Sequence, residues 1–148
     1  MYAPLVRRQV VLVVLDEVGR VALIPASRYE GGMRVPVVTV RRTESWVAAA
    51  AKGMVELGVR SFRWGNTVGH RWAYIPRGTG QVRVAERIYL ARASSAGGRI
   101  HGRCRPMVCW SDTELLSSST VVVPSPELAT LVAGYIEGWI PDGLVGLD

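Results

Sequence analysis

Residues 9–15, with the sequence QVVLVVL, are the feature that most constrains the fold. A run this rich in β-branched side chains favours a buried β-strand. Residues 16–20 then supply turn chemistry around Gly19, and the apolar stretch VALIP follows at 21–25. We therefore predict a β-hairpin in this part of the chain. The apolar run is far too short to span a bilayer, so we expect no membrane segment.

The stretch at 43–57 has the spacing of an amphipathic helix. Its apolar side chains recur at i, i+3, i+4 and i+7, and Gly58 stands where a left-handed C-cap is expected. Thr43 or Glu44 is expected to open the helix. The predicted buried face consists of Trp46, Ala49, Ala50, Gly53, Met54 and Leu57.

The remaining signals complete the predicted element order. We expect a strand at 35–40, interrupted at Pro36, and then a hairpin of strands at 70–75 and 81–93 that are joined by a turn at 76–80. A surface loop at 94–105 and a short strand at 107–110 follow. The last two expected elements are a helical turn at 112–116, capped by Ser111, and a helix from Pro124 to Trp139. Mixed strands with two separated helices predict an α/β or α+β sandwich, in which a mixed sheet lies between helices. A chain of 148 residues, of which 49% are hydrophobic, fits a single domain spanning 1–148.

The charge balance favours anionic partners. Eighteen Lys and Arg residues outweigh twelve Asp and Glu residues, which gives a formal net charge of +6. The basic residues are scattered along the sequence without the clustered stripe or aromatic interleaving of nucleic-acid-binding modules. We therefore expect an anionic small molecule or a protein partner rather than nucleic acid, with a solvated basic surface as the alternative interpretation. A homodimer is compatible with the sequence.

Two cysteines, Cys104 and Cys109, are too few for a disulfide framework and are only compatible with a reducing cytosol. Because we also expect no membrane segment, we predict a cytoplasmic protein. With His101 they form only a weak zinc pattern, because the sequence offers no second pair of ligands.

A spaced set of residues between 36 and 58 resembles a known signature. The set is Pro36, Glu44-Ser45, Ala49-Ala50, Lys52, Met54 and Glu56. This set of residues, together with the predicted order of elements, resembles the signature box of the Nudix superfamily. The box consists of Gly, five residues, Glu, seven residues and then Arg-Glu-aliphatic-any-Glu-Glu-any-Gly-aliphatic, and Pro-Gly-Gly normally precedes it. Residues 86–92, 110–115 and 123–131 resemble the flanks of actinobacterial-type members, and the Arg-, Ala- and Val-rich usage is typical of a high-GC bacterium. The resemblance covers nearly the whole chain and implies the Nudix fold.

The departures from this box fall where the family's chemistry lies. Val37-Val38 replace the Gly pair, Thr43 replaces the Gly before Glu44, and one residue is missing before Gly58. Gly53 replaces the Glu that serves as ligand or base, and Leu57 replaces another Glu. A register shift that restores Gly58 places Thr43 and Ala51 on the Glu and Arg positions, so neither register restores the carboxylates.

Nudix hydrolysis requires several carboxylates on one helical face, because Mg²⁺ prefers oxygen ligands and must bridge a diphosphate while a water is activated. The resemblance implies that Glu56 is the main surviving catalytic residue and a weak metal ligand. It also implies that Glu44 and Lys52 form an architectural pair that braces the loop against the helix. Glu44 nevertheless stays among the catalytic candidates.

Three functions agree with this sequence. The first is a hydrolase-like Nudix protein that binds a ligand or partner, or has a repurposed role, without hydrolysis and without a cofactor. The second is a divergent hydrolase that cleaves a nucleoside diphosphate derivative with Mg²⁺ and replacement carboxylates from Glu86, Asp112 or Glu114. The third is an enzyme of other chemistry in the same cleft, with acid, base or nucleophile candidates His70, Tyr74, Glu56 and Cys109. The sequence leaves open whether the protein is an enzyme.

Alternation along the strand at 70–75 places His70, Trp72 and Tyr74 on one face. An aromatic-lined pocket with a polar histidine is one interpretation, and ordinary sheet packing is the other. Arg41 and Arg42 could bind an anion without a metal, because guanidinium groups pair bidentately with phosphate or carboxylate; a solvated loop is the alternative. The catalytic candidates are thus Glu44, Glu56 and His70, and the ligand-binding candidates are Arg41, Arg42, Lys52, Trp72, Tyr74 and Glu86.

Overall fold

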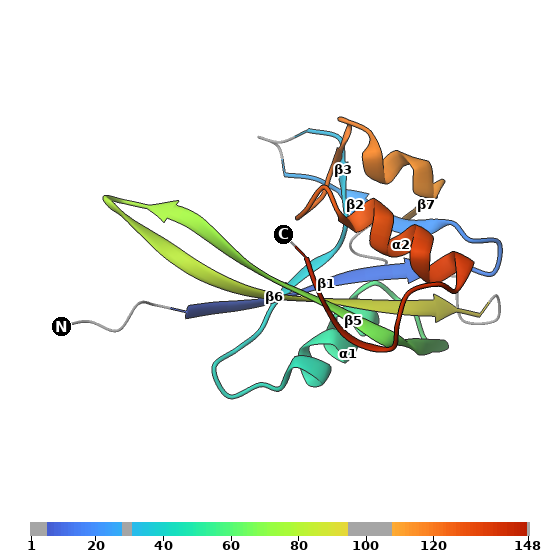
Figure 1. Cartoon of the computed structure of the whole chain (residues 1–148), viewed down its shortest axis with the longest axis horizontal. Coiled ribbons are helices and arrows are strands. Elements are labelled where there is room, and N and C mark those ends of the chain that lie inside the picture. The colour runs from blue at the N-terminus through green and yellow to red at the C-terminus, as the bar shows by residue number, and fades with distance from the viewer. Residues whose placement is uncertain (1–5, 28–30, 95–107, 148) are drawn as a thin grey trace.

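The computed structural model describes residues 6–27, 31–94 and 108–147 (Figure 1). Within these residues the strands and helices are β1 (Val6–Leu15), β2 (Val21–Pro25), β3 (Met33–Arg34), β4 (Val37–Thr39), α1 (Trp46–Glu56), β5 (Phe62–Arg77), β6 (Gly80–Ala93), β7 (Cys109–Ser111), the 3₁₀ helix η1 (Thr113–Ser117), β8 (Val121–Val122), α2 (Leu128–Glu137) and β9 (Gly143–Gly146). The expected loop at 94–105 falls almost wholly outside the described residues, as does Met107 at the start of the expected strand before Trp110.

Strand β1 organises the sheet. It pairs in parallel with β6 from Val6 opposite Arg83 to Leu15 opposite Arg92. Its other edge pairs antiparallel with β4 and, at the far end, with β2. The sheet order is β8-β3-β2-β1-β6-β5-β9, with β4 on β1 and β7 on β2. The predicted mixed sheet is therefore confirmed, and the predicted first hairpin is its β1–β2 pair.

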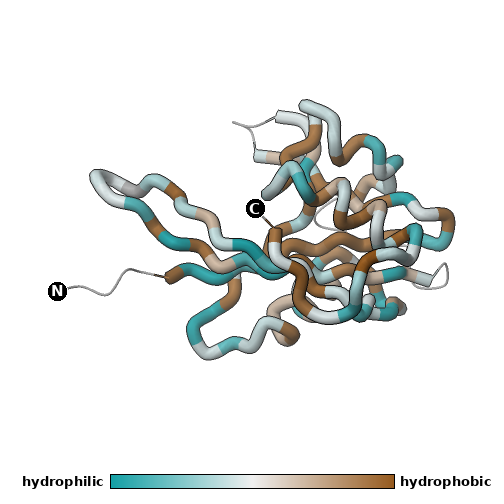
Figure 2. The backbone as a smooth tube through the Cα atoms, viewed as in Figure 1, coloured by the Kyte–Doolittle hydropathy of each residue, from teal (hydrophilic) through white to brown (hydrophobic). Residues whose placement is uncertain are grey.

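The sheet has a core on each face. Val10, Leu12 and Val14 of β1 belong to the core that α1 covers, whereas the alternate residues Val11, Val13 and Leu15 belong to the core that α2 covers. All six are 0% exposed, because helices cover the two opposite faces of this strand. Figure 2 shows the apolar stretches concentrated in this covered part of the molecule. The predicted sandwich of a mixed sheet between helices is confirmed.

The β5–β6 hairpin is longer than the sequence predicts. Strand β5 begins at Phe62 rather than at 70, and a register shift between Trp64 and Val68 marks a bulge in it. Gly65 lies in this bulge, where a Cβ atom would come within 2.9 Å of the Tyr135 hydroxyl oxygen. The bulge interrupts the alternation of apolar and polar side chains, so the sequence pattern did not predict the first half of β5. The turn is also tighter than expected, since Arg77 pairs with Gly80. The hairpin projects beyond the helices (Figure 1).

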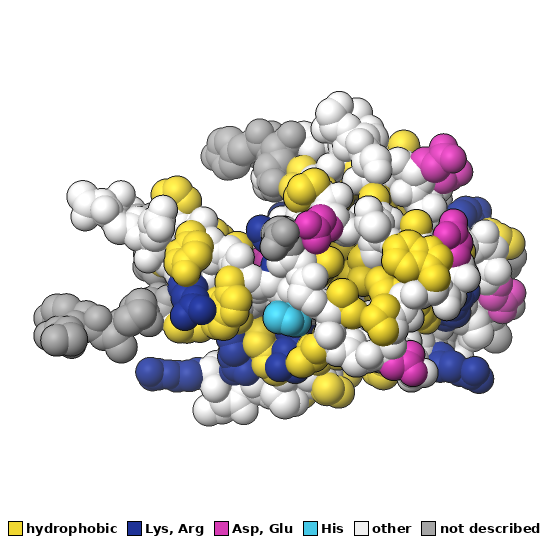
Figure 3. Space-filling view, in the orientation of Figure 1, with side chains coloured by type: hydrophobic (Ala, Val, Ile, Leu, Met, Phe, Trp, Pro, Cys, Tyr) yellow, Lys and Arg dark blue, Asp and Glu magenta, His cyan; other side chains and the backbone are white. Residues whose placement is uncertain are grey.

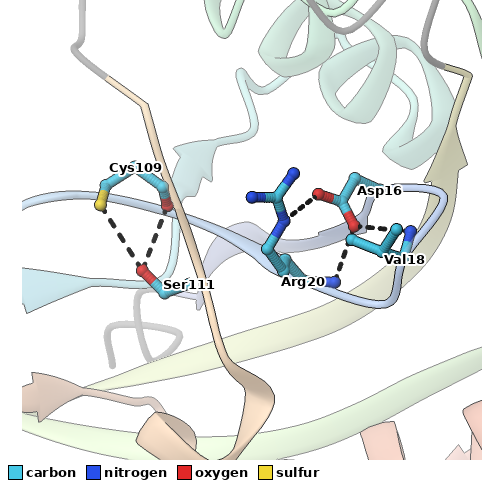
Figure 4. Close-up of polar contacts among 5 residues, drawn as sticks. All are labelled: Asp16, Val18, Arg20, Cys109 and Ser111. Atoms are coloured by element: carbon cyan, nitrogen blue, oxygen red, sulfur yellow. Dashed lines mark hydrogen bonds and ion pairs between the residues drawn. The ribbon is translucent and has the colours of Figure 1, made fainter.

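Local side-chain hydrogen bonds set several element ends. Helix α1 begins two or three residues later than predicted, because Ser45 is its N-cap and accepts a hydrogen bond from the Ala48 N–H at 3.1 Å. Gly58 adopts the predicted left-handed conformation with φ +78°. The turn at 16–20 is confirmed, and the Asp16 carboxylate accepts from the backbone N–H groups of Val18 and Arg20 (Figure 4).

The cap predicted for the turn at 112–116 was wrong. Asp112, rather than Ser111, caps η1 by accepting from the Glu114 N–H at 2.9 Å. The Ser111 hydroxyl instead contacts the carbonyl oxygen and the Sγ of Cys109 (Figure 4). Strands β8 and β9 were not predicted, because each is short and forms only by pairing with a distant strand.

Neither α1 nor α2 is long and apolar enough to cross a membrane, and this holds for every helix in the described residues.

The packing of α2 yields a stability prediction. Leu131 is 2% exposed in the core beneath α2, so Leu131→Ala should lower the free energy of unfolding by about 2–5 kcal/mol. Ile136 on the same helix is 40% exposed, and Ile136→Ala should change the free energy of unfolding by no more than about 0.5 kcal/mol. Urea unfolding of the two variants measures the contrast, and equal losses would contradict the assigned buried face.

Candidate ligand-binding site

Helix α1 presents the core, not carboxylates, at two of the positions where the Nudix pattern has Glu. A Cβ atom at Gly53 would lie 2.6 Å from Leu12 Cδ1 and 2.6 Å from Val38 Cγ2. Leu57 is 3% exposed in the same core. Val38 stands in place of the second Gly of the family pattern, so its side chain occupies space that a glycine would leave open.

The remaining box carboxylate, Glu56, lies exposed at the last turn of α1. No group of three or more His, Cys, Asp or Glu side chains that could hold a metal ion occurs among the residues that the structure describes. Mg²⁺ prefers several oxygen ligands, so the described side chains around α1 do not fit a divalent cation.

Glu44 and Lys52 form the pair that the family resemblance implies. Glu44 Oε1 accepts a hydrogen bond from the Arg41 backbone N–H at 3.0 Å, and Glu44 Oε2 lies 3.6 Å from Lys52 Nζ. The Arg41 N–H is the main cause that lowers the pKa of Glu44 below its usual value, and the Lys52 charge acts in the same direction. Glu44 therefore holds the loop before α1 in place.

Arg8 also anchors this loop. Its Nη2 donates to the backbone carbonyls of Arg41 at 2.8 Å, Glu44 at 3.0 Å and, at 3.3 Å, Arg42. The side chains of Arg41 and Arg42 are exposed. The loop therefore fixes Arg8 from β1 beside the first turn of α1.

A cavity of about 250 Å³ lies next to this anchored loop. It is lined by Val6, Arg8, Trp46, His70, Arg71, Trp72, Ala85, Glu86, Arg87 and Leu144. Of the predicted site residues, the structure brings His70, Trp72 and Glu86 together here. Tyr74 lies two residues further along β5 and is 59% exposed. Arg41, Arg42, Glu44, Lys52 and Glu56 do not line the cavity.

Two arginines flank the tryptophan at one side of the cavity. The Arg87 guanidinium carbon lies 4.8 Å from the centroid of the Trp46 ring, and that of Arg8 lies 5.4 Å from it. Such contacts fix the orientation of a guanidinium group by cation–π attraction. Within the described parts of the chain, Arg87 makes no hydrogen bond or ion pair, so its donors are available to a ligand.

Glu86 has both carboxylate oxygens occupied. Gln9 Nε2 donates to Oε1, and Arg71 Nη1 lies 2.9 Å from Oε2. Glu86 is 4% exposed, and a buried carboxylate needs such partners to stay charged. Of the arginines that line the cavity, Arg71 is therefore neutralised by Glu86, whereas Arg87 and the guanidinium nitrogens of Arg8 other than Nη2 can meet an anion.

Three further candidates lie elsewhere. Asp112 caps η1, Glu114 belongs to η1, and Cys109 is exposed on β7, which pairs with β2. Sequence reasoning missed Arg8, Trp46, Arg87 and Leu144 as cavity residues. Their assembly depends on the parallel β1–β6 register and on β9, and no local pattern reports either of these.

The Glu44 interactions predict a pH dependence. A carboxyl group whose pKa is lowered in the folded state stabilises the fold above its unfolded pKa, and this stabilisation is lost as pH falls through the folded pKa. Glu44→Gln should therefore be less stable than the unchanged protein near neutral pH, and the difference should shrink on acidification. Urea unfolding between about pH 7 and pH 3 tests this. A difference that stays constant over that range would contradict the assigned interactions.

No protein-family model matches the sequence, and no curated protein matches it. Solved structures do resemble the fold. The C. elegans Ap4A hydrolase is 13% identical, with a TM-score of 0.61, over 92% of this chain and 100% of that one. The E. coli dihydroneopterin triphosphate pyrophosphohydrolase is 12% identical, with a TM-score of 0.60, over 88% of this chain and 95% of that one.

A NUDIX hydrolase from Nitrosomonas europaea is 10% identical, with a TM-score of 0.56, and 92% of each chain is covered. Identities this low show a shared fold and carry no activity across. Coverage of nearly the whole of each chain agrees with the sheet order and the two helix layers described above. The chain therefore has the fold of the Nudix superfamily.

Proposed function

We propose that this chain is a Nudix-fold binding protein, which holds an anionic ligand at the cavity beside Trp46 without a divalent cation and without Nudix hydrolysis. The observation that carries the proposal is the packing of Gly53 against Leu12 and Val38. A helix position that fills the core cannot at the same time offer a carboxylate to a metal ion.

The loss of these carboxylates affects both steps of the family's chemistry. A single exposed carboxylate at Glu56 is a poor site for a cation that must also bridge a diphosphate. Loss of a positioned general base lowers a rate by a further factor on the order of 10²–10⁴. The divergent hydrolase is therefore the less favoured function, since Glu86 and Asp112 already serve structural roles.

The cavity supports the ligand class. Arg8 and Arg87 are held against Trp46, and arginine pairs bidentately with phosphate or carboxylate oxygens. One solved structure of similar fold is named for a triphosphate substrate. We propose that this chain binds a phosphate-bearing ligand through arginine instead of through a bridging metal.

The core position of Gly53 predicts that restoring the family residue damages the fold. Gly53→Glu should lower the free energy of unfolding by about 3 kcal/mol or more, because overpacking costs about 1–3 kcal/mol and a buried unpaired charge adds to it. Gly53→Ala should also destabilise, although alanine favours a helix by about 1 kcal/mol.

Val55→Glu is the matched control, since Val55 on the same helix is 76% exposed and the change should cost no more than about 0.5 kcal/mol. Urea unfolding measures all three variants. A Gly53→Glu protein as stable as Val55→Glu would show that position 53 has room for a carboxylate.

Anion binding is tested by calorimetric titration with inorganic pyrophosphate in the presence of a chelator. We expect binding without metal and a loss of about tenfold or more in Arg87→Ala, since a hydrogen bond to a charged group contributes about 1.5–3 kcal/mol. Arg63→Ala is the control, because exposed Arg63 lies at the start of β5 and does not line the cavity.

Binding that appears only with Mg²⁺, or turnover of a nucleoside diphosphate derivative that requires Mg²⁺, would support the hydrolase instead.

A further inference from the structure

We infer that the binding face continues from the cavity along the β5–β6 hairpin and accepts single-stranded nucleic acid, with bases on its exposed aromatic rings and phosphates on its arginines. This inference rests on the proposed function, because the cavity forms one end of the face.

The strand register places aromatic and basic residues on one face of the hairpin. His70 lies opposite Arg87, Trp72 opposite Ala85, and Tyr74 opposite Arg83. Cross-strand partners share a face of the sheet, and successive residues on that face are about 6.6 Å apart along each strand. The hairpin therefore presents a ladder in which rings and guanidinium groups alternate.

Strand β1 extends the same face on the other side of β6. Its residue Arg8 lies opposite Ala85, and Val6 lies opposite Arg83. Ala85 is thus the small residue between Trp72 on one side and Arg8 on the other. A shallow floor between a ring and a guanidinium group suits a flat ring with a phosphate attached.

The rings on this face are not used in the core. Trp72 is 46% exposed and Tyr74 is 59% exposed, so much of each ring is accessible to a ligand. The Arg83 guanidinium carbon lies 3.6 Å from the Trp72 ring centroid, and Arg83 Nε is buried without a hydrogen-bond partner in the described residues. Stacked guanidinium and indole groups form a rigid platform.

The charge of this region matches a polyanion. Glu44 is paired with Lys52 beside this face, and Glu86 is paired with Arg71 on the opposite face of the sheet, which leaves an unbalanced set of arginines: Arg8, Arg41, Arg42, Arg83 and Arg87. Figure 3 shows Lys and Arg side chains grouped with apolar ones around the base of the hairpin. The sequence argued against nucleic acid because its basic residues are scattered along the chain. The strand pairing brings several of them together on one face.

The combination of exposed aromatic rings and arginines on this face favours single-stranded nucleic acid over an acidic peptide. Each base stacked on an aromatic side chain contributes about 1–3 kcal/mol, whereas an acidic peptide supplies carboxylates but no regular series of flat rings. A duplex keeps its bases stacked on each other, so it can reach the arginines but not the rings.

The test measures binding of a fluorescein-labelled 12-nucleotide oligothymidylate to the full chain by anisotropy, alongside the pyrophosphate titration. We expect the single strand to bind more tightly than both pyrophosphate and a duplex of equal length. Trp72→Ala and Tyr74→Ala should each weaken oligonucleotide binding at least fivefold, and Trp72→Phe should restore most of it because phenylalanine still stacks. Arg83→Ala should reduce the slope of log K against log salt by about 1.

Trp139→Ala is the matched control, since Trp139 is 58% exposed and follows α2, away from this face; its binding should not change. Melting temperatures of all variants show whether each remains folded. The inference would be overturned if duplex and single strand bound equally, or if Trp72→Ala and Tyr74→Ala had no effect on oligonucleotide binding. Pyrophosphate binding in the same experiment would still support the proposed function. Failure of pyrophosphate binding itself would overturn both.

Discussion

The parallel pairing of β1 with β6 is the constraint on which the rest of the structure depends. It places β1 between strands on both edges and beneath a helix on each face, so that Val10 to Leu15 are withdrawn from water completely. Parallel pairs with covered faces read as continuous apolar runs for this reason. The same register places the polar first half of β1 beside the start of α1, where Arg8 and Arg87 both contact the Trp46 ring.

Core packing and chemistry compete for the same face of α1. In the Nudix pattern this helix supplies several carboxylates, whereas here Gly53 and Leu57 close the core against Leu12 and its neighbours. The Glu44–Lys52 pair, which holds the loop, is kept. The chain has a Nudix fold whose helix secures the core, and the ligand contacts that we propose lie on the sheet strands beyond it.

Local patterns predicted much of the fold and part of the site. The first hairpin, the buried face of α1, the Gly58 cap and the shared face of His70, Trp72 and Tyr74 all follow from residue spacing within one element. The first half of β5 was hidden by the bulge at Gly65, and β8 and β9 exist only through pairing with distant strands. Arg8 and Arg87 could not be assigned to one cavity, since they are far apart in sequence and meet only through long-range register.

We infer that the helix face of the box belongs to the core and leaves no divalent site among the residues that the structure describes. Mn²⁺ relaxation titration of the unchanged protein and of Glu56→Gln tests it most directly, because the paramagnetic ion reports binding without any substrate. We expect no saturable binding at millimolar metal and the same response from both proteins. Tight Mn²⁺ binding that Glu56→Gln abolishes would contradict this inference and would support a metal-dependent hydrolase instead.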